Sequence, residues 1–349
     1  MRPSLLTVSL FSLALLPATL CAPMLRAQEA PSPSGPPPST GAPPPLDTEL
    51  EGPTLKENVN LVNLYFSARD KDGFITNLAK SDCSVIEDKV PQIIKNFTQE
   101  KKLPLTIGLL LDTSGSQQNV LPLEQQSGAT FLRDVLTPKD EAFLISFDIN
   151  VDLLADYTNR ASEIRRALEK ASINTGAGTG SVTGHGEPRG TLLYDAVFLA
   201  AHDKLNQEAG RKVIVMLTDG GDQGSQETLK SATEAAQKAN TIVYVILIAD
   251  HAFYGGGFGI NLADIGARDM DRLASDTGGR VINVGNNGKK LEDAFQQIQD
   301  ELRTQYLASY TPTNAKADGT YRKVDLTCGK NVKVDTRKGY YAISSADTQ

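Results

Sequence analysis

The stretch that decides the fold reads LTIGLLLDTSGS and covers residues 105–116. Its first part is short and almost continuously apolar, which is typical of a strand buried on both faces of a parallel sheet. A polar loop follows, and the sequence then predicts a helix over 118–136. Asp112 therefore lies where a parallel strand ends, which is the edge at which doubly wound sheets place their ligands.

The end of this stretch follows the pattern D-x-S-x-S, which puts one carboxylate and two hydroxyls on a tight turn: Asp112, Ser114 and Ser116. Three hard oxygens that converge in this way suit Mg²⁺ or another hard divalent cation. The pattern alone also fits an ordinary turn with a helix cap, because Asp and Ser are common in both. Other stretches of the sequence are needed to distinguish a cation site from a capped turn.

Two later stretches favour the metal site. Residues 190–196 read GTLLYDA, which places Thr191 at the start of a predicted helix, and residues 213–220 read VIVMLTDG, a second buried strand that ends near Asp219. Taken with the first stretch, they resemble the metal-ion-dependent adhesion site of the von Willebrand factor A domain. In that family an Asp and two Ser of the first motif, a Thr from a second loop and an Asp from a third loop surround one cation. The resemblance implies one Mg²⁺ or Mn²⁺ held by Asp112, Ser114, Ser116, Thr191 and Asp219.

The likeness extends over about 55–342. The flanking stretches DKDG at 70–73, VIED at 85–88 and RKGYY at 337–341 resemble secreted bacterial proteins called VWFA-related. The chain departs from that pattern at Cys83, near which the family usually has an aromatic residue.

The apolar pattern changes along the chain and predicts its domains. Residues 102–305 alternate predicted strands and helices, which implies a doubly wound, mostly parallel, Rossmann-like α/β sheet with helices on both faces. The segments on either side, 54–101 and 306–349, instead show short alternating strands. We expect these two segments to form one small β-sandwich into which the A-type domain is inserted. Two separate β appendages are the alternative.

The N-terminus has the composition of a secretory signal. Arg2 supplies the positive end and residues 5–16 form an apolar core too short to span a membrane, which predicts a signal peptide over 1–27. Cys21 closes a sequence that resembles a lipobox, although Leu20 is larger than such motifs prefer. We therefore expect a secreted, periplasmic or cell-envelope protein, with a lipid anchor on Cys21 as the alternative.

A proline-rich stretch over 28–53 follows the signal. Nine of the 18 prolines fall between Pro31 and Pro53. Such a segment cannot build a core, and it is predicted to be an extended, disordered linker.

Composition limits the classes of partner. The chain has 349 residues, of which 40% are hydrophobic and 22% charged, enough for two globular domains. Its formal net charge is -7, and an acidic chain without a basic cluster argues against nucleic acid. No apolar run of about 18 residues follows the N-terminus, so no transmembrane segment is expected in the mature chain.

Counting cysteines predicts a disulfide. Of the three cysteines, Cys21 leaves with the signal or carries a lipid, so that Cys83 and Cys328 remain as an even pair in an exported chain. They lie in the β segments before and after the A-type domain, and a bridge would join those segments. Two buried free thiols are the alternative.

Two further acids lie near the predicted site in the sequence. Asp195 is expected to orient hydroxyls or to cap a helix, with direct metal binding as the alternative. Asp222 either supplies negative charge behind the cation ligands or is a solvated loop acid.

The leading functional hypothesis is a secreted, non-enzymatic binding protein of the adhesion type. Two carboxylates only just balance a divalent cation, so a partner's Asp or Glu carboxylate could fill an open position, as the family resemblance implies. One alternative is a structural cell-envelope scaffold with a vestigial metal site. Another is a hydrolase that uses the metal to activate water, for which the motifs offer no general base.

Overall fold

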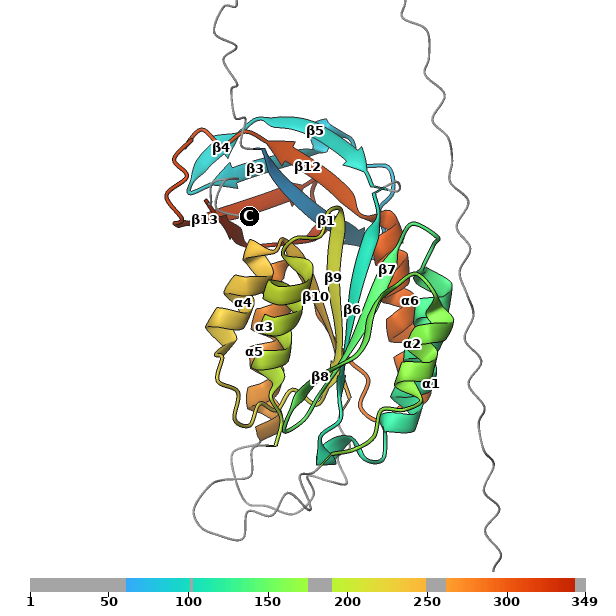
Figure 1. Cartoon of the computed structure of the whole chain (residues 1–349). Helices are drawn as coiled ribbons and strands as arrows, with labels where there is room; N and C mark the ends of the chain where they lie inside the picture. Colours follow the sequence, from blue (N-terminus) through green and yellow to red (C-terminus); the bar gives the residue numbers. More distant parts are fainter. Residues whose placement is uncertain (1–60, 101–102, 175–189, 249–261, 343–349) are drawn as a thin grey trace, which may run out of the picture. The chain divides into compact units, whose positions relative to one another are not determined.

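The computed structural model describes residues 61–100, 103–174, 190–248 and 262–342 (Figure 1). The predicted signal peptide over 1–27 and the predicted linker over 28–53 lie outside these residues. Within the described ranges, no helix is both long enough and apolar enough to cross a membrane.

The centre of the fold is a six-stranded sheet. Its neighbouring strands pair in parallel except at one edge, where β8 is antiparallel to β7, so the sheet is mostly parallel as the sequence predicts. In spatial order the strands are β11 (Val281–Asn283), β10 (Thr241–Leu247), β9 (Arg211–Thr218), β6 (Leu105–Asp112), β7 (Glu141–Phe147) and β8 (Val151–Thr158). Every residue of β6, β9 and β10 is buried, which explains why these segments are rich in Val, Ile and Leu.

Helices cover both faces of this sheet (Figure 1). One layer consists of α1 (Leu121–Val135), α2 (Ala161–Leu168) and α6 (Gly288–Thr304). The other consists of α3 (Leu193–Leu199), α4 (Leu229–Lys238) and α5 (Leu262–Thr277). Alternate residues of β6 serve the two layers, because Leu109 and Leu111 belong to the core on the first side and Leu110 to the core on the second. The helix predicted to start at Thr191 is observed as α3 followed by a π-helix, η3 (Ala200–Leu205).

Two smaller sheets combine strands from before and after the α/β segment. The first, in spatial order, is β14 (Lys333–Thr336), β1 (Val62–Asp70), β12 (Tyr306–Tyr310) and β5 (Ile94–Gln99), with β2 (Gly73–Phe74) paired to β1. The second is β15 (Gly339–Tyr341), β13 (Tyr321–Cys328), β3 (Cys83–Glu87) and β4 (Val90–Gln92). One buried cluster contains Leu64 and Phe66 from the first sheet and Val85 and Leu326 from the second.

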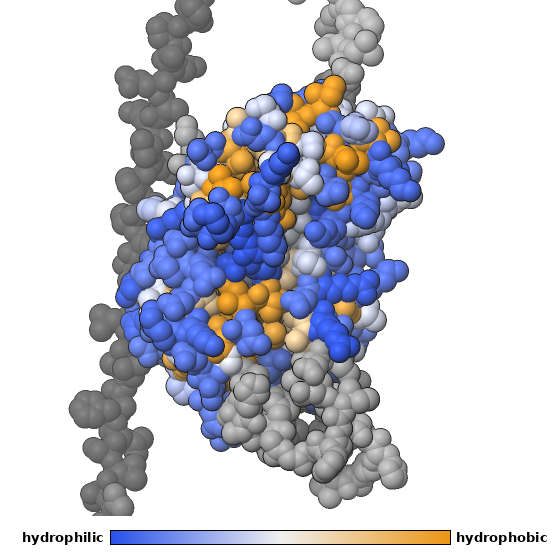
Figure 2. Space-filling model, turned by 180° about the vertical axis from the view of Figure 1, so that it is seen from behind, coloured by the Kyte–Doolittle hydropathy of each residue, from blue (hydrophilic) through white to orange (hydrophobic). Residues whose placement is uncertain are grey.

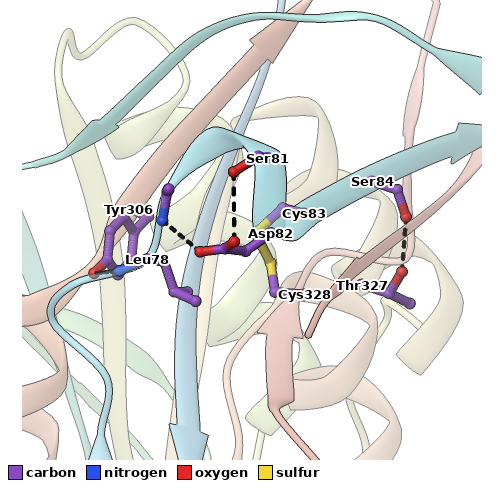
Figure 3. Close-up of a disulfide and its surroundings, with 9 residues drawn as sticks. Leu78, Ser81, Asp82, Cys83, Ser84, Tyr306, Thr327 and Cys328 are labelled. Carbon is purple, nitrogen blue, oxygen red and sulfur yellow. Dashed lines mark hydrogen bonds between the residues drawn. A yellow bond between two sulfur atoms is a disulfide. The ribbon is translucent and has the colours of Figure 1, made fainter. Parts of the chain in front are cut away.

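The predicted bridge between Cys83 and Cys328 is present (Figure 3). The two residues are direct register partners on β3 and β13, with their Cα atoms 4.0 Å apart. The next pair along the ladder, Ser84 and Thr327, joins its side-chain oxygens at 3.0 Å. A segment that precedes the α/β domain is thus covalently joined to one that follows it.

A buried glutamate links the smaller sheets to the α/β domain. Glu301 of α6 accepts hydrogen bonds from Ser67 Oγ of β1 at 2.7 Å, from Tyr244 Oη of β10 at 3.0 Å and from Arg280 Nε at 2.9 Å. The carboxylate is therefore fully used in joining three parts of the chain.

The surface is mainly hydrophilic on the face turned away from the view of Figure 1, with hydrophobic residues in separate patches (Figure 2). Some of these patches lie at the end that carries the two smaller sheets. Exposed large hydrophobic residues there include Val90 at 48% and Ile93 at 81% of their accessible area.

Candidate metal centre

The site begins with Asp112, the last residue of β6. The side chain is fully buried, and both of its oxygens have partners from the protein. Oδ1 accepts a hydrogen bond from the backbone N–H of Ser114 at 3.0 Å, and Oδ2 accepts one from Thr218 Oγ1 at 2.7 Å. Thr218 ends the neighbouring parallel strand β9, so strand ends that are far apart in the sequence meet at this edge.

The two serines of the first motif follow at once. Ser114 is buried, and its Oγ lies 3.1 Å from Ser116 Oγ. Ser114 precedes the short 3₁₀ helix η2 (Gly115–Gln117), which turns the chain toward α1. The tight turn therefore keeps the two hydroxyls together beside the strand that carries Asp112.

Thr191 and Asp219 lie on two loops that hydrogen-bond to each other. The N–H of Gln223 donates to Thr191 O at 2.8 Å, and Thr191 N–H donates to Gln223 O at 3.3 Å. Leu192 N–H donates to Asp148 O at 2.8 Å, which fixes the Thr191 loop to the end of β7 as well. Asp219 is buried, and its Oδ1 accepts a hydrogen bond from Gly221 N–H at 3.0 Å.

Several acidic side chains are buried near one another at the site, and this raises the pKa values of two of them. Burial, followed by the charge of Asp219, raises the pKa of Asp112 to about 7. Burial, followed by the charges of Asp112 and Asp219, raises the pKa of Glu124 well above its ordinary value. The neighbours that shift Glu124 are thus both acids, and a divalent cation is the kind of group that would relieve their repulsion.

Coordination here would depend on the hydroxyls. Among the described residues, no three His, Cys, Asp or Glu side chains converge closely enough to hold a metal ion. The predicted ligand set is compatible with this finding, because it contains only two carboxylates and takes its remaining oxygens from two serines and a threonine. Hard oxygen donors of this kind fit Mg²⁺ or Mn²⁺ better than a soft metal.

Asp148, which the sequence interpretation missed, supports the first motif from the side. It is buried, its Oδ2 accepts a hydrogen bond from Thr113 Oγ1 at 2.7 Å, and its Oδ1 accepts one from Asn174 Nδ2 at 2.9 Å. Its position directly after strand β7 is the signal that could have found it, because β7 is parallel to β6 and ends at the same edge.

Both of the additional acids predicted near the site accept hydrogen bonds from loops and helix starts. Asp222 Oδ1 accepts from Leu193 N–H at 3.1 Å and from Ser225 Oγ at 2.6 Å. Burial raises its pKa. Asp195 accepts from the N–H of Gln226 at 3.1 Å and of Glu227 at 2.7 Å. The structure thus gives both residues a role in holding the Thr191 loop against the loop after Asp219.

An open cleft of about 470 Å³ lies next to the Thr191 loop. Its apolar lining includes Val151, Leu192 and Phe198. Four acids also line it: Asp152, Asp195, Asp203 and Glu227. The cleft therefore combines an apolar surface with a strongly negative one.

Comparison with known proteins gives partial structural likenesses. No protein-family model matches the chain, and no curated protein matches it. One similar solved structure is the conserved hypothetical protein BatB from Bacteroides thetaiotaomicron, with 19% identity, a TM-score of 0.43 and coverage of 57% of this chain and 99% of that one. Another is the vWF domain of the type V pili tip protein Mfa5 from Porphyromonas gingivalis, with 13% identity, a TM-score of 0.42 and coverage of 57% and 95%.

A third similar structure is proximal thread matrix protein 1 from the mussel byssus with a zinc-occupied MIDAS motif. It has 16% identity and a TM-score of 0.46, and the match covers 62% of this chain and 50% of that protein. The structures similar to this chain thus include a vWF domain and a protein with a MIDAS motif, each matched over part of the length of this chain. These structural similarities are too partial to indicate a function. Evidence for the function has to come from the residues of the site.

Proposed function

We propose that the chain is a secreted, non-enzymatic, adhesion-type binding module whose cation holds a carboxylate of a protein partner. The ligands of one Mg²⁺ or Mn²⁺ would be Asp112, Ser114, Ser116, Thr191 and Asp219. The observation that carries the proposal is the pair of buried acids, Asp112 and Asp219, placed with three hydroxyls at one sheet edge. When bound, the cation would supply an electrophilic position for an Asp or Glu of the partner.

The cleft beside Thr191 supports a second contact with that partner. Its four acids favour a segment with Lys or Arg near the coordinating carboxylate, and its apolar lining favours a neighbouring hydrophobic side chain. We therefore propose a protein partner that presents an acidic residue next to basic and apolar ones.

The cation can be tested by calorimetry with Mg²⁺ and Mn²⁺. The Asp112→Ala variant should lose binding at millimolar concentrations, because it removes one of the two compensating charges. Asp140→Ala is the matched control, since Asp140 is also buried but accepts hydrogen bonds from Leu105 N–H at 2.9 Å and Thr137 N–H at 2.9 Å near the start of β6. Unchanged affinity in Asp112→Ala would refute the assignment.

The partner contact can be tested by retention of envelope proteins on the immobilised chain. We expect retention to be lost with a chelator and with Thr191→Ala, while circular dichroism shows an unchanged fold. Thr233→Ala is the control, because Thr233 is a buried threonine that hydrogen-bonds within α4. Partner binding that withstands the chelator would place the interaction on another surface.

We also propose that the two smaller sheets are the layers of one β-sandwich, built from 54–101 and 306–349, with 102–305 inserted. Their shared core and the Cys83–Cys328 bridge support this arrangement. A disulfide of this kind persists in oxidising compartments, which supports export to the periplasm, the cell envelope or the medium.

A further inference from the structure

One buried acid near the candidate metal centre lacks a hydrogen-bond partner in the part of the chain that the structure describes. Glu124, in the first turn of α1, is fully buried, and neither of its carboxylate oxygens has a hydrogen-bond partner among the described residues. Gln117 of η2 has 1% of its area exposed, and in the same described part of the chain neither its amide oxygen nor its amide nitrogen has a partner. Buried polar groups are almost always hydrogen-bonded, so two such side chains need an explanation.

Glu124 lies on the buried face of α1. The buried positions of α1 recur with helical spacing and include Leu121, Gly128, Phe131 and Val135. Glu124 lies on the same buried stripe, where an apolar residue would pack without loss. Its side chain is also not used to cap the helix, which begins without a side-chain cap. Local structure therefore gives no reason for a carboxylate at this position.

Glu124 is exposed to the charges of the proposed cation ligands. The charged groups that act on it are Asp112 and Asp219, both proposed ligands, and both oppose its ionisation. Gln117 lies one residue after Ser116, and its N–H donates to Ser114 O at 3.0 Å. The two side chains that have no hydrogen-bond partner among the described residues thus belong to the segment that follows the first motif, and Glu124 is exposed to the charges of two proposed ligands.

We infer that Glu124 is a positioning residue of the cation site, and that it acts with Gln117 through water bound to the cation. This inference rests on the proposed function. The carboxylate would accept hydrogen bonds from such water, and the Gln117 amide can both donate and accept in the same network. Glu124 would not bind the cation directly, because among the described residues no three His, Cys, Asp or Glu side chains converge closely enough to hold a metal ion.

The decisive variant is Glu124→Gln, which keeps the shape of the side chain and removes its charge. With Mg²⁺ alone as the probe, calorimetry should show an affinity lowered by about tenfold or more, as is typical when a group behind the metal ligands is changed. Without Mg²⁺, the variant should unfold at a temperature at least as high as the wild-type chain, because an unpaired buried carboxylate is gone. The rise in unfolding temperature on adding Mg²⁺ should be smaller than in wild type.

Two further variants separate this role from a merely structural one. Glu124→Leu continues the apolar stripe and should lose affinity in the same way. Glu301→Gln is the matched control, because Glu301 is equally buried but fully hydrogen-bonded, so it should lower the unfolding temperature and leave Mg²⁺ affinity unchanged.

The outcomes distinguish the two proposals. Wild-type affinity in both Glu124 variants would overturn the positioning role while the five-residue site stands. Absence of any Mg²⁺ or Mn²⁺ binding by the wild-type chain would overturn the proposed function and this inference together.

Discussion

Charged side chains are buried at both ends of the central strands. Asp112 and Asp219 lie at one end, and Arg211 and Lys212 lie at the other, at the start of β9, where each has 8% of its area exposed. Acids at the end where parallel strands finish suit a cation site, whereas the burial of a lysine charge costs stability.

Lys212 gives a pH dependence whose sign can be worked out. Burial lowers its pKa from 10.5 to about 8, with Glu208 opposing the shift and Arg337 adding to it. Because the folded chain binds this proton less tightly than the unfolded chain, the cost is complete below pH 8 and is relieved as pH rises toward 10.5. We expect Lys212→Met to add about 2 kcal/mol of stability at pH 7, as measured by urea unfolding.

The control for this prediction is the pH series itself. The stability difference between Lys212→Met and wild type should shrink as pH rises above 8, which separates the removal of the charge from better packing. A difference that stays constant up to pH 10 would contradict the explanation.

The residues of the site differ in how well a sequence reveals them. The positions of Asp112 and Asp219 at the ends of buried strands could be predicted, because each follows an apolar run typical of such a strand. Glu124 could not, because a glutamate in the first turn of a helix is usually solvent-exposed and favourable there. Asp148 was missed for a similar reason, since an Asp before a turn has an ordinary explanation.

At the level of elements, the loop after β9 packs closely on α5. A Cβ atom on Gly266 would lie 2.3 Å from the carbonyl oxygen of Gly220, and Gly220 has a φ of 86° that favours glycine. Gly220 directly follows Asp219, so the contact between α5 and this loop positions one of the proposed cation ligands.

Gly266→Ala should therefore destabilise the chain, although alanine has a higher helix propensity than glycine. We expect it to cost about 1–3 kcal/mol through overpacking and to weaken Mg²⁺ binding, measured by unfolding and calorimetry. Gly128→Ala is the matched helical control, because its Cβ would make an ordinary contact at 3.4 Å with Leu109. That variant should be neutral or stabilise by up to about 1 kcal/mol; equal behaviour of the two would argue against close packing at Gly220.

Element types were easier to predict than their limits. The edge strand β8 runs from Val151 to Thr158, and its end is hard to predict because partly buried and exposed residues are mixed along it without a continuous apolar run. The helix predicted over 118–136 begins only at Leu121, because residues 118–120 form a turn between the end of η2 at Gln117 and the start of α1. Tertiary packing at sheet edges and helix starts decides such limits, and the local sequence does not carry that information.

At the scale of the whole molecule, pairing between distant strands closes the two smaller sheets. β1 pairs with β12 and β14, and β3 pairs with β13, across the whole α/β segment. Cysteine counting could predict one contact of this kind, but not the register of the remaining strands.

The bridge should contribute measurably to stability. Replacing both Cys83 and Cys328 by serine should lower the free energy of unfolding by about 2–4 kcal/mol, measured with denaturant under non-reducing conditions. Reduced wild-type protein serves as the control and should show the same loss. Equal stability of the oxidised and serine forms would contradict the prediction.

The same bridge decides how the molecule would carry mechanical load. Tension applied from either side of the bridge passes from Cys83 to Cys328 through the sulfur atoms and bypasses the polypeptide between them, a separation of 245 residues. At roughly 3.3–3.6 Å per residue, the extended length of the chain between the two cysteines is on the order of 800 Å. Stretching cannot release this length until the disulfide is reduced. The candidate metal centre lies within the segment that the bridge bypasses. Tension would therefore unfold the strands before Cys83 and after Cys328, and it would not be transmitted along the chain that carries the proposed cation ligands.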